Sequence, residues 1–365
     1  MEHTFTANIK QILENHFGVH ASDIFEKSQL LQYLNDKTRS ANRGSKSRGS
    51  FATLYSIYVI IEDYIQKEFN ISNTYSQYEG AAFSSLLKRA RELPFGNKIQ
   101  NHAFNNRVNK EFNNRYHNEI PIIQNINKRY WINENLLQIS IGVEIYNLAP
   151  VIIEIIDEYT KTKQDSFQRF IKNCEQLQAM EHSEPEKVVE FVKGLLAPNV
   201  DARLFEIVSY SILKYFYQDK IIYWGFEKDD LNEENLKLYK TGRTNANDGG
   251  IDFVMRPIGR FFQVTETLDF KKYFLDIDKI QKFPITFVIK SEEDIEVLSK
   301  KIENNANKIY SISLIVNKYM ECIEEIINIP KLQDCFEATI ANGHLNDVLR
   351  EIIMQSKVEF NYVEI

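Results

Sequence analysis

The sequence predicts an α+β protein, with a mostly helical N-terminal region and a mixed α/β C-terminal domain. In the N-terminal half, apolar residues such as Leu54, Ile57 and Ile61 recur at helical spacing. After the break at Pro198, helical patterns alternate with short β-branched and aromatic runs, which is typical of a sheet covered by helices. We therefore expect a domain boundary at residue 198, separating domains over 1–198 and 199–365.

The expected elements follow from these patterns in chain order. The N-terminal region contains a core helix around Leu54 to Ile65 and ends in helices over Ser166–Met180 and Glu184–Leu196. The C-terminal domain reads as helix, strand, two hairpin strands, helix, strand, helix and strand, over Asp201–Tyr217, Ile221–Phe226, Gly250–Met255, Arg260–Glu266, Asp269–Lys282, Ile285–Lys290, Glu292–Asn304 and Ile309–Val316.

Composition excludes several classes of protein. With 365 residues, 43% of them hydrophobic and 26% charged, the chain can bury a core and is unlike disordered or collagenous sequences. No apolar run reaches the roughly 18 residues of a membrane span, and the N-terminus lacks a signal-peptide pattern, so we expect a cytoplasmic protein. The three cysteines show no metal-ligand spacing, and we expect them to be reduced thiols.

Charge is unevenly distributed along the chain. The formal net charge of −7 argues against a protein that coats nucleic acid indiscriminately. However, the segment Lys37–Arg48 has five basic residues and no acid, and Lys88–Arg129 has nine basic residues against three acids. The segment Glu321–Ile365 reverses this, with nine acids against three basic residues. We therefore expect a positive and a negative side.

The basic segments contain the residues that we expect to contact DNA phosphates. Lys and Arg set affinity for nucleic acid through phosphates, whereas Asn, Gln, Ser and Arg can read base edges. A solvated loop is the simpler interpretation of such a charge run. The expected phosphate contacts are Lys37, Arg39, Arg43, Lys46 and Arg48, whereas Arg107 and Arg115 are among the DNA-binding residues that could read bases.

A group of oxygen-bearing side chains is predicted at the hairpin between residues 250 and 266. If the loop Arg256-Pro257-Ile258-Gly259 closes the hairpin so that Met255 pairs with Arg260, Asp252 lies opposite Gln263. Side chains alternate along a strand, so Gln263 and Thr265 point the same way as Asp252. Such a group, with room for several waters, suits Mg²⁺.

Glu206 lies within the preceding helix, whose apolar stripe is expected to press on the sheet, so its carboxylate can approach the same edge. Each of these residues also has a purely structural interpretation. An Asp after Gly-Gly is often a turn residue, a buried Gln is usually satisfied by its neighbours, and a Glu on a helix is usually a solvated charge. The order of the three residues along the chain favours a shared site.

That order resembles the catalytic core of the PD-(D/E)XK nuclease superfamily, in particular its Mrr-like and type II restriction endonuclease branches. The matching segments are Leu204-Phe205-Glu206, Asp248-Gly249-Gly250-Ile251-Asp252 and Phe262-Gln263-Val264-Thr265. The resemblance implies a restriction-endonuclease-like α-β-β-β-α-β core with a mixed sheet over about 201–316. It also implies Mg²⁺ held by Asp252, Gln263 and Glu206, and hydrolysis of DNA phosphodiesters.

One position departs from the family pattern. The last motif of the family normally ends in Lys, and this sequence has Thr265 there. Either Glu266 or Thr265 acts in its place with a second metal ion, or a lysine from elsewhere fills the space, or the site is inactive. The lysines considered are Lys290, Lys240 and Lys271.

The sequence thus predicts a type II restriction endonuclease that hydrolyses phosphodiester bonds in double-stranded DNA at a specific sequence with Mg²⁺. Two identical sites about a two-fold axis suit cleavage of both strands at a palindrome, so we expect a homodimer. Two alternatives stay open. One is a catalytically inactive DNA-binding protein with a nuclease-like fold, and the other is a protein-interaction scaffold that uses the acidic C-terminal segment.

Overall fold

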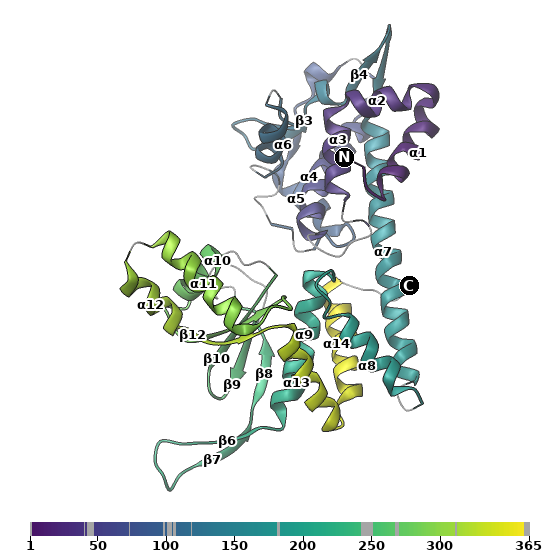
Figure 1. Ribbon diagram of the computed structural model, residues 1–365. Helices are drawn as coiled ribbons and strands as arrows, with labels where there is room; N and C mark the ends of the chain where they lie inside the picture. Colours follow the sequence, from purple (N-terminus) through teal and green to yellow (C-terminus); the bar gives the residue numbers. More distant parts are fainter. Residues whose placement is uncertain are drawn as a thin grey trace. The chain divides into compact units, whose positions relative to one another are not determined.

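The computed structural model describes residues 2–39, 41, 47–72, 74–97, 99–100, 104, 107–117, 119–180, 183–241, 251–266, 270–310 and 312–360 (Figure 1). The chain folds into two compact units, Met1–Phe170 with Phe360–Ile365, and Ile171–Glu359. The division falls inside helix α7, Ala149–Met180, earlier in the chain than the boundary that we placed at residue 198. The end of α7 and helix α8, Pro185–Gly194, therefore belong to the second unit.

The first unit is mainly helical, with two small antiparallel sheets, β1-β3-β2 and β4-β5. Its helices and strands are α1 (Thr6–Phe17), α2 (Ala21–Lys27), α3 (Gln29–Lys37), α4 (Ser47–Gln66), β1 (Ala81–Ala82), α5 (Phe83–Glu92), α6 (Val108–Tyr116), β2 (Ile122–Gln124), β3 (Arg129–Ile132), β4 (Gln138–Ile141), β5 (Glu144–Asn147) and the first part of α7.

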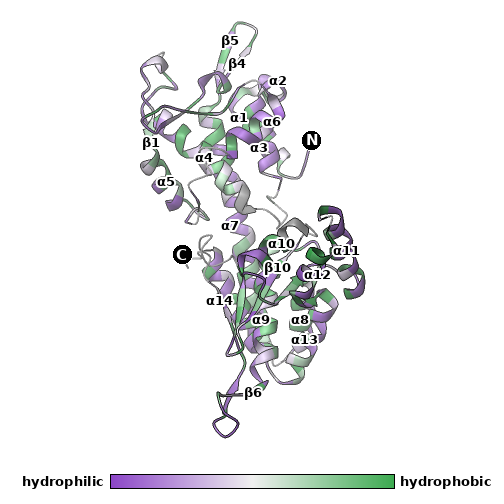
Figure 2. Ribbon diagram, turned by 90° about the vertical axis from the view of Figure 1, so that its left-hand side faces the viewer, coloured by the Kyte–Doolittle hydropathy of each residue, from purple (hydrophilic) through white to green (hydrophobic). Residues whose placement is uncertain are grey.

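Helix α4 forms the centre of the first unit, as its apolar spacing predicts. The middle turns of α4 are hydrophobic (Figure 2), and Leu54, Ile57 and Ile61 are fully buried. Tyr55 donates a hydrogen bond to the Pro94 carbonyl at 2.7 Å, which satisfies a hydroxyl that would otherwise be buried without a partner. The core therefore surrounds α4 on all sides.

The second unit contains a five-stranded mixed sheet with helices on both sides. Its elements are the end of α7, α8, α9 (Ala202–Gln218), β6 (Ile221–Trp224), β7 (Asn232–Asn235), β8 (Lys237–Lys240), β9 (Phe253–Arg256), β10 (Arg260–Thr265), α10 (Phe270–Lys279), β11 (Ile285–Ile289), α11 (Ile295–Ile309), α12 (Ser313–Glu321), β12 (Ile323–Ile327), α13 (Ile329–Ala341) and α14 (Leu345–Phe360).

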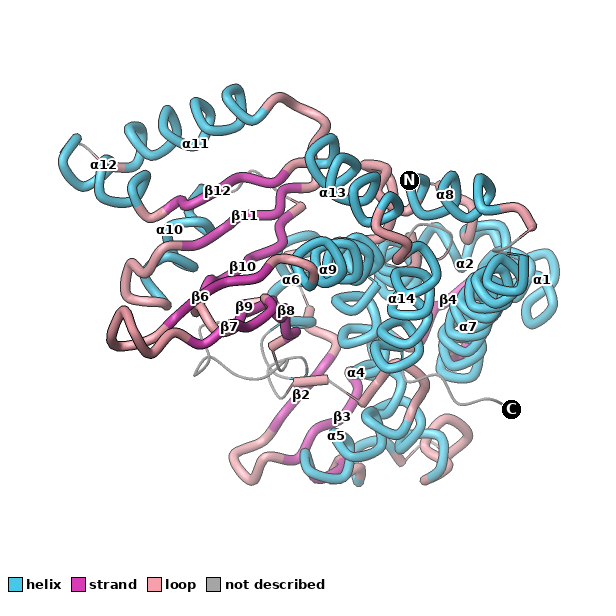
Figure 3. The backbone as a smooth tube through the Cα atoms, turned by 90° about the horizontal axis from the view of Figure 1, so that it is seen from below, coloured by secondary structure: helices cyan, strands magenta, loops and turns pink. Residues whose placement is uncertain are grey.

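Strand order in this sheet is β12-β11-β10-β9-β8 (Figure 3). Strands β8, β9 and β10 form an antiparallel meander, whereas β10, β11 and β12 run parallel to one another. Strands β10 and β11 are joined through α10, as parallel neighbours require a crossover. The α-β-β-β-α-β order is present over α9, β8, β9, β10, α10 and β11, and the fold is mixed α+β. Its first strand is not the one that we expected, because Ile221–Phe226 forms β6 outside this sheet and β8, which we did not predict, takes its place.

The two faces of the sheet are covered by different helices. Phe253 of β9 pairs with Phe262 of β10, and these side chains contact Tyr210 and Tyr217 of α9. On the other face, Phe287 of β11 contacts Tyr273 of α10, with ring centroids 4.5 Å apart. Because side chains alternate along a strand, residues next to Phe262 in sequence point toward α10.

The last predicted strand is wrong. We expected a strand over Ile309–Val316, but α11 ends at Ile309 and α12 begins at Ser313. Ile309, Ile312 and Ile315 are three residues apart, so the same β-branched run also fits a helical period. The strand that completes the sheet is β12, where Glu324 and Glu325 interrupt the apolar pattern because β12 is an edge strand.

Strands β6 and β7 form a separate two-stranded hairpin that extends from the unit beyond the end of α9 (Figure 1). The three cysteines, Cys174, Cys322 and Cys335, are free and buried. Burial raises the pKa of the Cys335 thiol to about 11, so it stays protonated at neutral pH. Within the described ranges, each helix is too short or too polar to cross a lipid bilayer.

Candidate active site

The hairpin register places Asp252 beside Gln263, as predicted. Met255 pairs with Arg260 and Phe253 pairs with Phe262. One residue before β9 begins, the backbone N–H of Asp252 donates to the Phe262 carbonyl at 3.1 Å. Strand β10 continues beyond this pair, where β9 no longer lies beside it. The N–H groups on that edge of β10 then need a partner other than the backbone of β9.

The Asp252 carboxylate occupies that edge of β10. Its Oδ2 atom accepts hydrogen bonds from the backbone N–H of Val264 and from the Gln263 amide Nε2, each at 2.8 Å. Bonds from N–H donors to a carboxylate are short and stabilise the charged form. The sequence therefore places a partly exposed carboxylate directly before β9, held by two donors from the neighbouring strand β10.

The Gln263 amide is buried and only partly satisfied. The residue is 5% exposed, and its Nε2 donates to Asp252. No described residue donates a hydrogen bond to Gln263 Oε1, although this oxygen is buried. An unsatisfied buried oxygen is costly and uncommon, so it marks a place where a water or a cation is expected.

Thr265 is buried on the α10 side of the sheet. It is 4% exposed and interacts with Tyr273, where its hydroxyl opposes the rise in the pKa of Tyr273 that burial causes. A threonine packed against a helix in this way has limited access to solvent. Its position is consistent with a structural role as well as with the catalytic role that we predicted.

Glu206 lies on the opposite face from Gln263. Lys240, the last residue of β8, pairs in register with Phe253 and so points toward α9. There its Nζ lies 3.3 Å from Glu206 Oε1, and both side chains are mostly buried. The structure thus joins Glu206 to a lysine, and it does not bring Glu206 to Gln263.

Lys240 nevertheless senses the charge of Asp252. Burial lowers the pKa of Lys240, while attraction to Glu206 and, more weakly, to Asp252 opposes this shift. The backbone also ties the two positions together, because the Thr241 N–H donates to the Asp252 carbonyl at 3.0 Å. Lys240 is therefore a mostly buried lysine next to the start of β9, in a strand so short that its pattern alone does not identify it.

Arg203, which the sequence reasoning missed, completes a chain of alternating charges. It pairs with Glu206 one helical turn away and lies 3.3 Å from Glu359 of α14. The spacing of Arg203 and Glu206, three residues apart on α9, was the available signal. The described part of the chain contains no group of three or more His, Cys, Asp or Glu side chains that could hold a metal ion. The predicted triad of Asp252, Gln263 and Glu206 is not assembled.

Glu266 and Lys290 form a second ion pair at the ends of β10 and β11. Lys290 Nζ lies 2.8 Å from Glu266 Oε1 and also donates to the Val200 carbonyl. The lysine side chain is 3% exposed, so both groups are held in place within the fold. The side chain of Lys271 lies outside the described residues.

The described DNA-binding candidates all take part in ion pairs on α3 and α6. Lys37 and Arg107 share Glu111 of α6, and Arg39 and Arg115 share Asp36 of α3. Four cations thus surround two carboxylates and leave a surplus of two positive charges. Arg43 and Lys46 lie outside the described residues, as does the side chain of Arg48, whose backbone belongs to α4.

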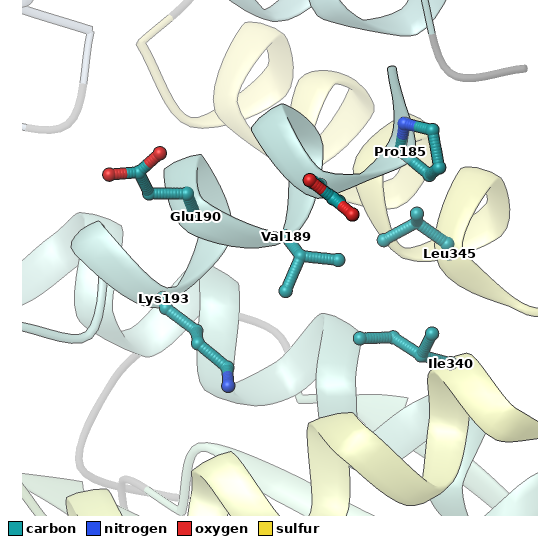
Figure 4. Close-up of a pocket in the computed structure, with 7 residues that line it drawn as sticks. Pro185, Val189, Glu190, Lys193, Ile340 and Leu345 are labelled. Atoms are coloured by element: carbon teal, nitrogen blue, oxygen red, sulfur yellow. The ribbon is translucent and has the colours of Figure 1, made fainter. Parts of the chain in front are cut away.

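A hollow of about 470 Å³ lies elsewhere in the second unit (Figure 4). Pro185 and Val189 of α8 face Ile340 of α13 and Leu345 of α14, while Glu186, Glu190 and Lys193 line it as well. None of the predicted site residues lines this hollow. It is separate from the Asp252 site.

Comparison with models of known protein families, with curated proteins and with solved structures finds no match to this chain. The resemblance to the PD-(D/E)XK superfamily therefore rests on the residues themselves.

Proposed function

We propose that the chain is a Mg²⁺-dependent type II restriction endonuclease that cleaves double-stranded DNA as a homodimer. The observation that carries the proposal is the contact between Asp252 and Gln263 at the open end of the β9–β10 hairpin. In the family that the sequence resembles, this place in an α-β-β-β-α-β core is the catalytic centre. The element order and the hairpin register both support the proposal.

The residues present fit a hard divalent cation at this point. The amide of Gln263 touches the carboxylate of Asp252, and its buried Oε1 receives no donor from the described residues. Two protein oxygens are enough for Mg²⁺, which usually keeps several waters. When bound, Mg²⁺ would neutralise charge that develops on the phosphodiester.

The protein residues then have distinct roles. Asp252 and Gln263 would hold the cation. Lys240 lies with Glu206 on the α9 face, so to accept a proton from the attacking water it would leave Glu206 and turn past the start of β9 toward Asp252. Of the lysines that we considered, Lys290 is engaged by Glu266 and Val200 and Lys240 by Glu206, but Lys240 has a lowered pKa and is also attracted, more weakly, to Asp252. A lysine whose pKa is lowered gives up its proton more readily and is a better base candidate than an ordinary lysine.

We expect purified protein with Mg²⁺ to cut unmethylated phage DNA into discrete fragments, and Asp252→Asn to abolish cutting. Asparagine keeps an acceptor for the Val264 N–H but removes the charge that a cation needs. The measurement is fragment-end sequencing, with DNA binding followed by fluorescence anisotropy. Binding should survive in the variant, because phosphate contacts lie in other segments.

The matched control is Glu303→Ala, which removes an exposed carboxylate on α11 and should leave cleavage intact. A second readout is thermal. Mg²⁺ or Ca²⁺ should raise the melting temperature of the wild-type protein and leave that of Asp252→Asn unchanged. Equal cutting by the wild type and Asp252→Asn would remove Asp252 from the site.

The second candidate is a DNA-binding protein without catalysis. The observation that favours it is the burial of Thr265 and Gln263, together with the engagement of Glu206 by Arg203 and Lys240. This candidate predicts salt-sensitive DNA binding with no cleavage in any divalent metal. The scaffold alternative has less support, because Glu325, Glu351 and Glu359 are paired within the fold.

A further inference from the structure

The β6–β7 hairpin has two edges of different character. Neither strand pairs with any other described strand. Strand β7 reads Asn-Glu-Glu-Asn, and charged residues of this kind protect an edge from pairing with another strand. Strand β6 reads Ile-Ile-Tyr-Trp and contains no charge and no proline. The edge of β6 is therefore open to pairing.

The same hairpin exposes large apolar side chains. Phe226 at its tip is fully exposed, and Tyr223 and Trp224 of β6 are 64% and 41% exposed. Ile221 and Leu231 are each about half exposed. Clusters of this kind on a soluble protein mark an interaction surface. Both the backbone edge and the side chains of β6 are thus available to a partner.

The charge of the hairpin indicates which kind of partner it fits. Residues 221–235 contain five acids and Lys228 as their single basic residue, and the tip is hydrophilic (Figure 2). A strongly acidic arm is repelled by nucleic acid and by anionic lipid. A protein partner is favoured, and it must place positive charge near the acidic tip.

The chain itself supplies that charge. Lys220 is exposed at the base of the hairpin, directly before β6, whereas Glu227, Asp229 and Asp230 are exposed at the tip. When two copies of β6 align antiparallel, the base of each hairpin lies beside the tip of the other. Lys220 of one copy then faces the acids of the second copy, and a two-fold axis repeats the contact.

We propose that two copies of the chain associate through their β6 edges, antiparallel about a two-fold axis. The inference does not depend on nuclease activity. Exposed aromatic and aliphatic groups of this size bury on the order of 1,000 Å² in total, at the lower end of specific interfaces. The dimer should therefore have a dissociation constant in the micromolar range.

Sedimentation velocity of the full chain, without DNA or divalent metal, tests the proposal over about 1 to 100 μM, the range that interfaces of this size suggest. The wild type should pass from monomer to dimer, and Tyr223→Lys should stay monomeric at concentrations at least tenfold higher. The matched control, Asn232→Lys, adds the same charge to β7 and should dimerise as the wild type does.

A charge swap tests the antiparallel arrangement. Lys220→Glu alone and Asp229→Lys with Asp230→Lys should each weaken the dimer, because each places like charges together at both ends of β6. The chain that carries all three substitutions restores opposite charges and should dimerise again. Restoration of this kind cannot come from misfolding, and circular dichroism of each variant checks the fold.

Three results would overturn the proposal. The wild type could remain monomeric throughout the concentration range. It could dimerise equally well with Tyr223→Lys, which would place the interface elsewhere. It could also dimerise only when DNA is added, which would make DNA the agent that brings the copies together.

Discussion

At the scale of single residues, Asp252 does two things at once. It satisfies the N–H of Val264, which would otherwise face no strand, and it receives the amide of Gln263. The first is a structural task that an asparagine can perform. The second holds the Gln263 amide through Nε2, while the buried Oε1 of the same amide has no described donor. The site proposal rests on this difference.

Lys240 provides a prediction about pH. We expect Lys240→Met to lower the cleavage rate about 100-fold or more while DNA affinity stays unchanged, because loss of a general base affects the chemical step. Lys240→Arg should not restore cleavage, since arginine keeps its proton. In the wild type, cleavage should rise with pH as Lys240 loses its proton. The measurement is single-turnover cleavage across pH, and Lys237→Met on the same strand is the control.

The stability of the fold gives an independent check on Lys240. Its folded pKa lies below 10.5, so above the folded value the folded chain has released a proton that the unfolded chain still binds. The free energy of unfolding should therefore rise with pH between the folded pKa and 10.5. Lys240→Met should lose that rise. An unchanged pH dependence in the variant would show that Lys240 is not the lysine with the lowered pKa.

The sequence predicted part of this site. The Arg256-Pro257-Ile258-Gly259 loop was sufficient to set the register, and the register brought Asp252 to Gln263. The ion pair between Glu206 and Lys240 could not be predicted, because the strand that contains Lys240 has four residues and one buried position. Which side chains share a face of the sheet can be predicted only when every strand and its register have been identified.

At the scale of elements, Arg260 links three neighbouring strands of the sheet. Its guanidinium donates to the Thr286 hydroxyl of β11 at 2.9 Å and 2.8 Å. It also pairs with Glu324 and Glu325 of β12. Strands β11 and β12 are parallel, so no hairpin loop fixes the position of β12 against β11. The Arg260 side chain supplies a link between these strands, which are distant in sequence.

We expect Arg260→Ala to lower the free energy of unfolding by about 1.5–3 kcal/mol, the range for losing hydrogen bonds to charged groups. The side chain is 16% exposed, so water only partly replaces what is lost. Urea unfolding followed by circular dichroism measures the change. Arg256→Ala, an exposed position at the end of β9, should change it by no more than a few tenths of a kcal/mol. Equal losses in both variants would contradict the role given to Arg260.

The elements that the sequence predicted best are those with a single dominant period. Helix α9 begins after Asp201, whose side chain accepts the N–H groups of Arg203 and Leu204, and its bounds match the expectation closely. Strand β12 was missed because two glutamates at a sheet edge disguise it. Its charges are explained by Arg260, which lies more than sixty residues earlier and is invisible to a local pattern.

At the scale of the whole molecule, charge is divided between the two units. The first unit, residues 1–170 with 360–365, contains 20 Lys and Arg against 19 Asp and Glu, whereas residues 171–359 contain 24 against 32. The unit that contains Asp252 is thus the more negative one. In the function that we propose, electrostatic attraction to DNA would come mainly from the N-terminal unit. Within that unit, the largest described cluster of predicted DNA contacts lies on α3 and α6, and part of its charge is cancelled by Asp36 and Glu111.

This cancellation leads to a prediction about DNA affinity. We expect Asp36→Asn to strengthen DNA binding, because it frees Arg39 and Arg115 from their shared carboxylate and so adds positive charge to the surface. Arg115→Ala should weaken binding and reduce the slope of log affinity against log salt by about one, since each phosphate contact releases about one counterion. Fluorescence anisotropy at several salt concentrations measures both effects. Glu26→Gln, an exposed acid on α2, is the control for net charge. If Glu26→Gln strengthened binding as much as Asp36→Asn, only the total charge would matter and the α3–α6 cluster would not contact DNA.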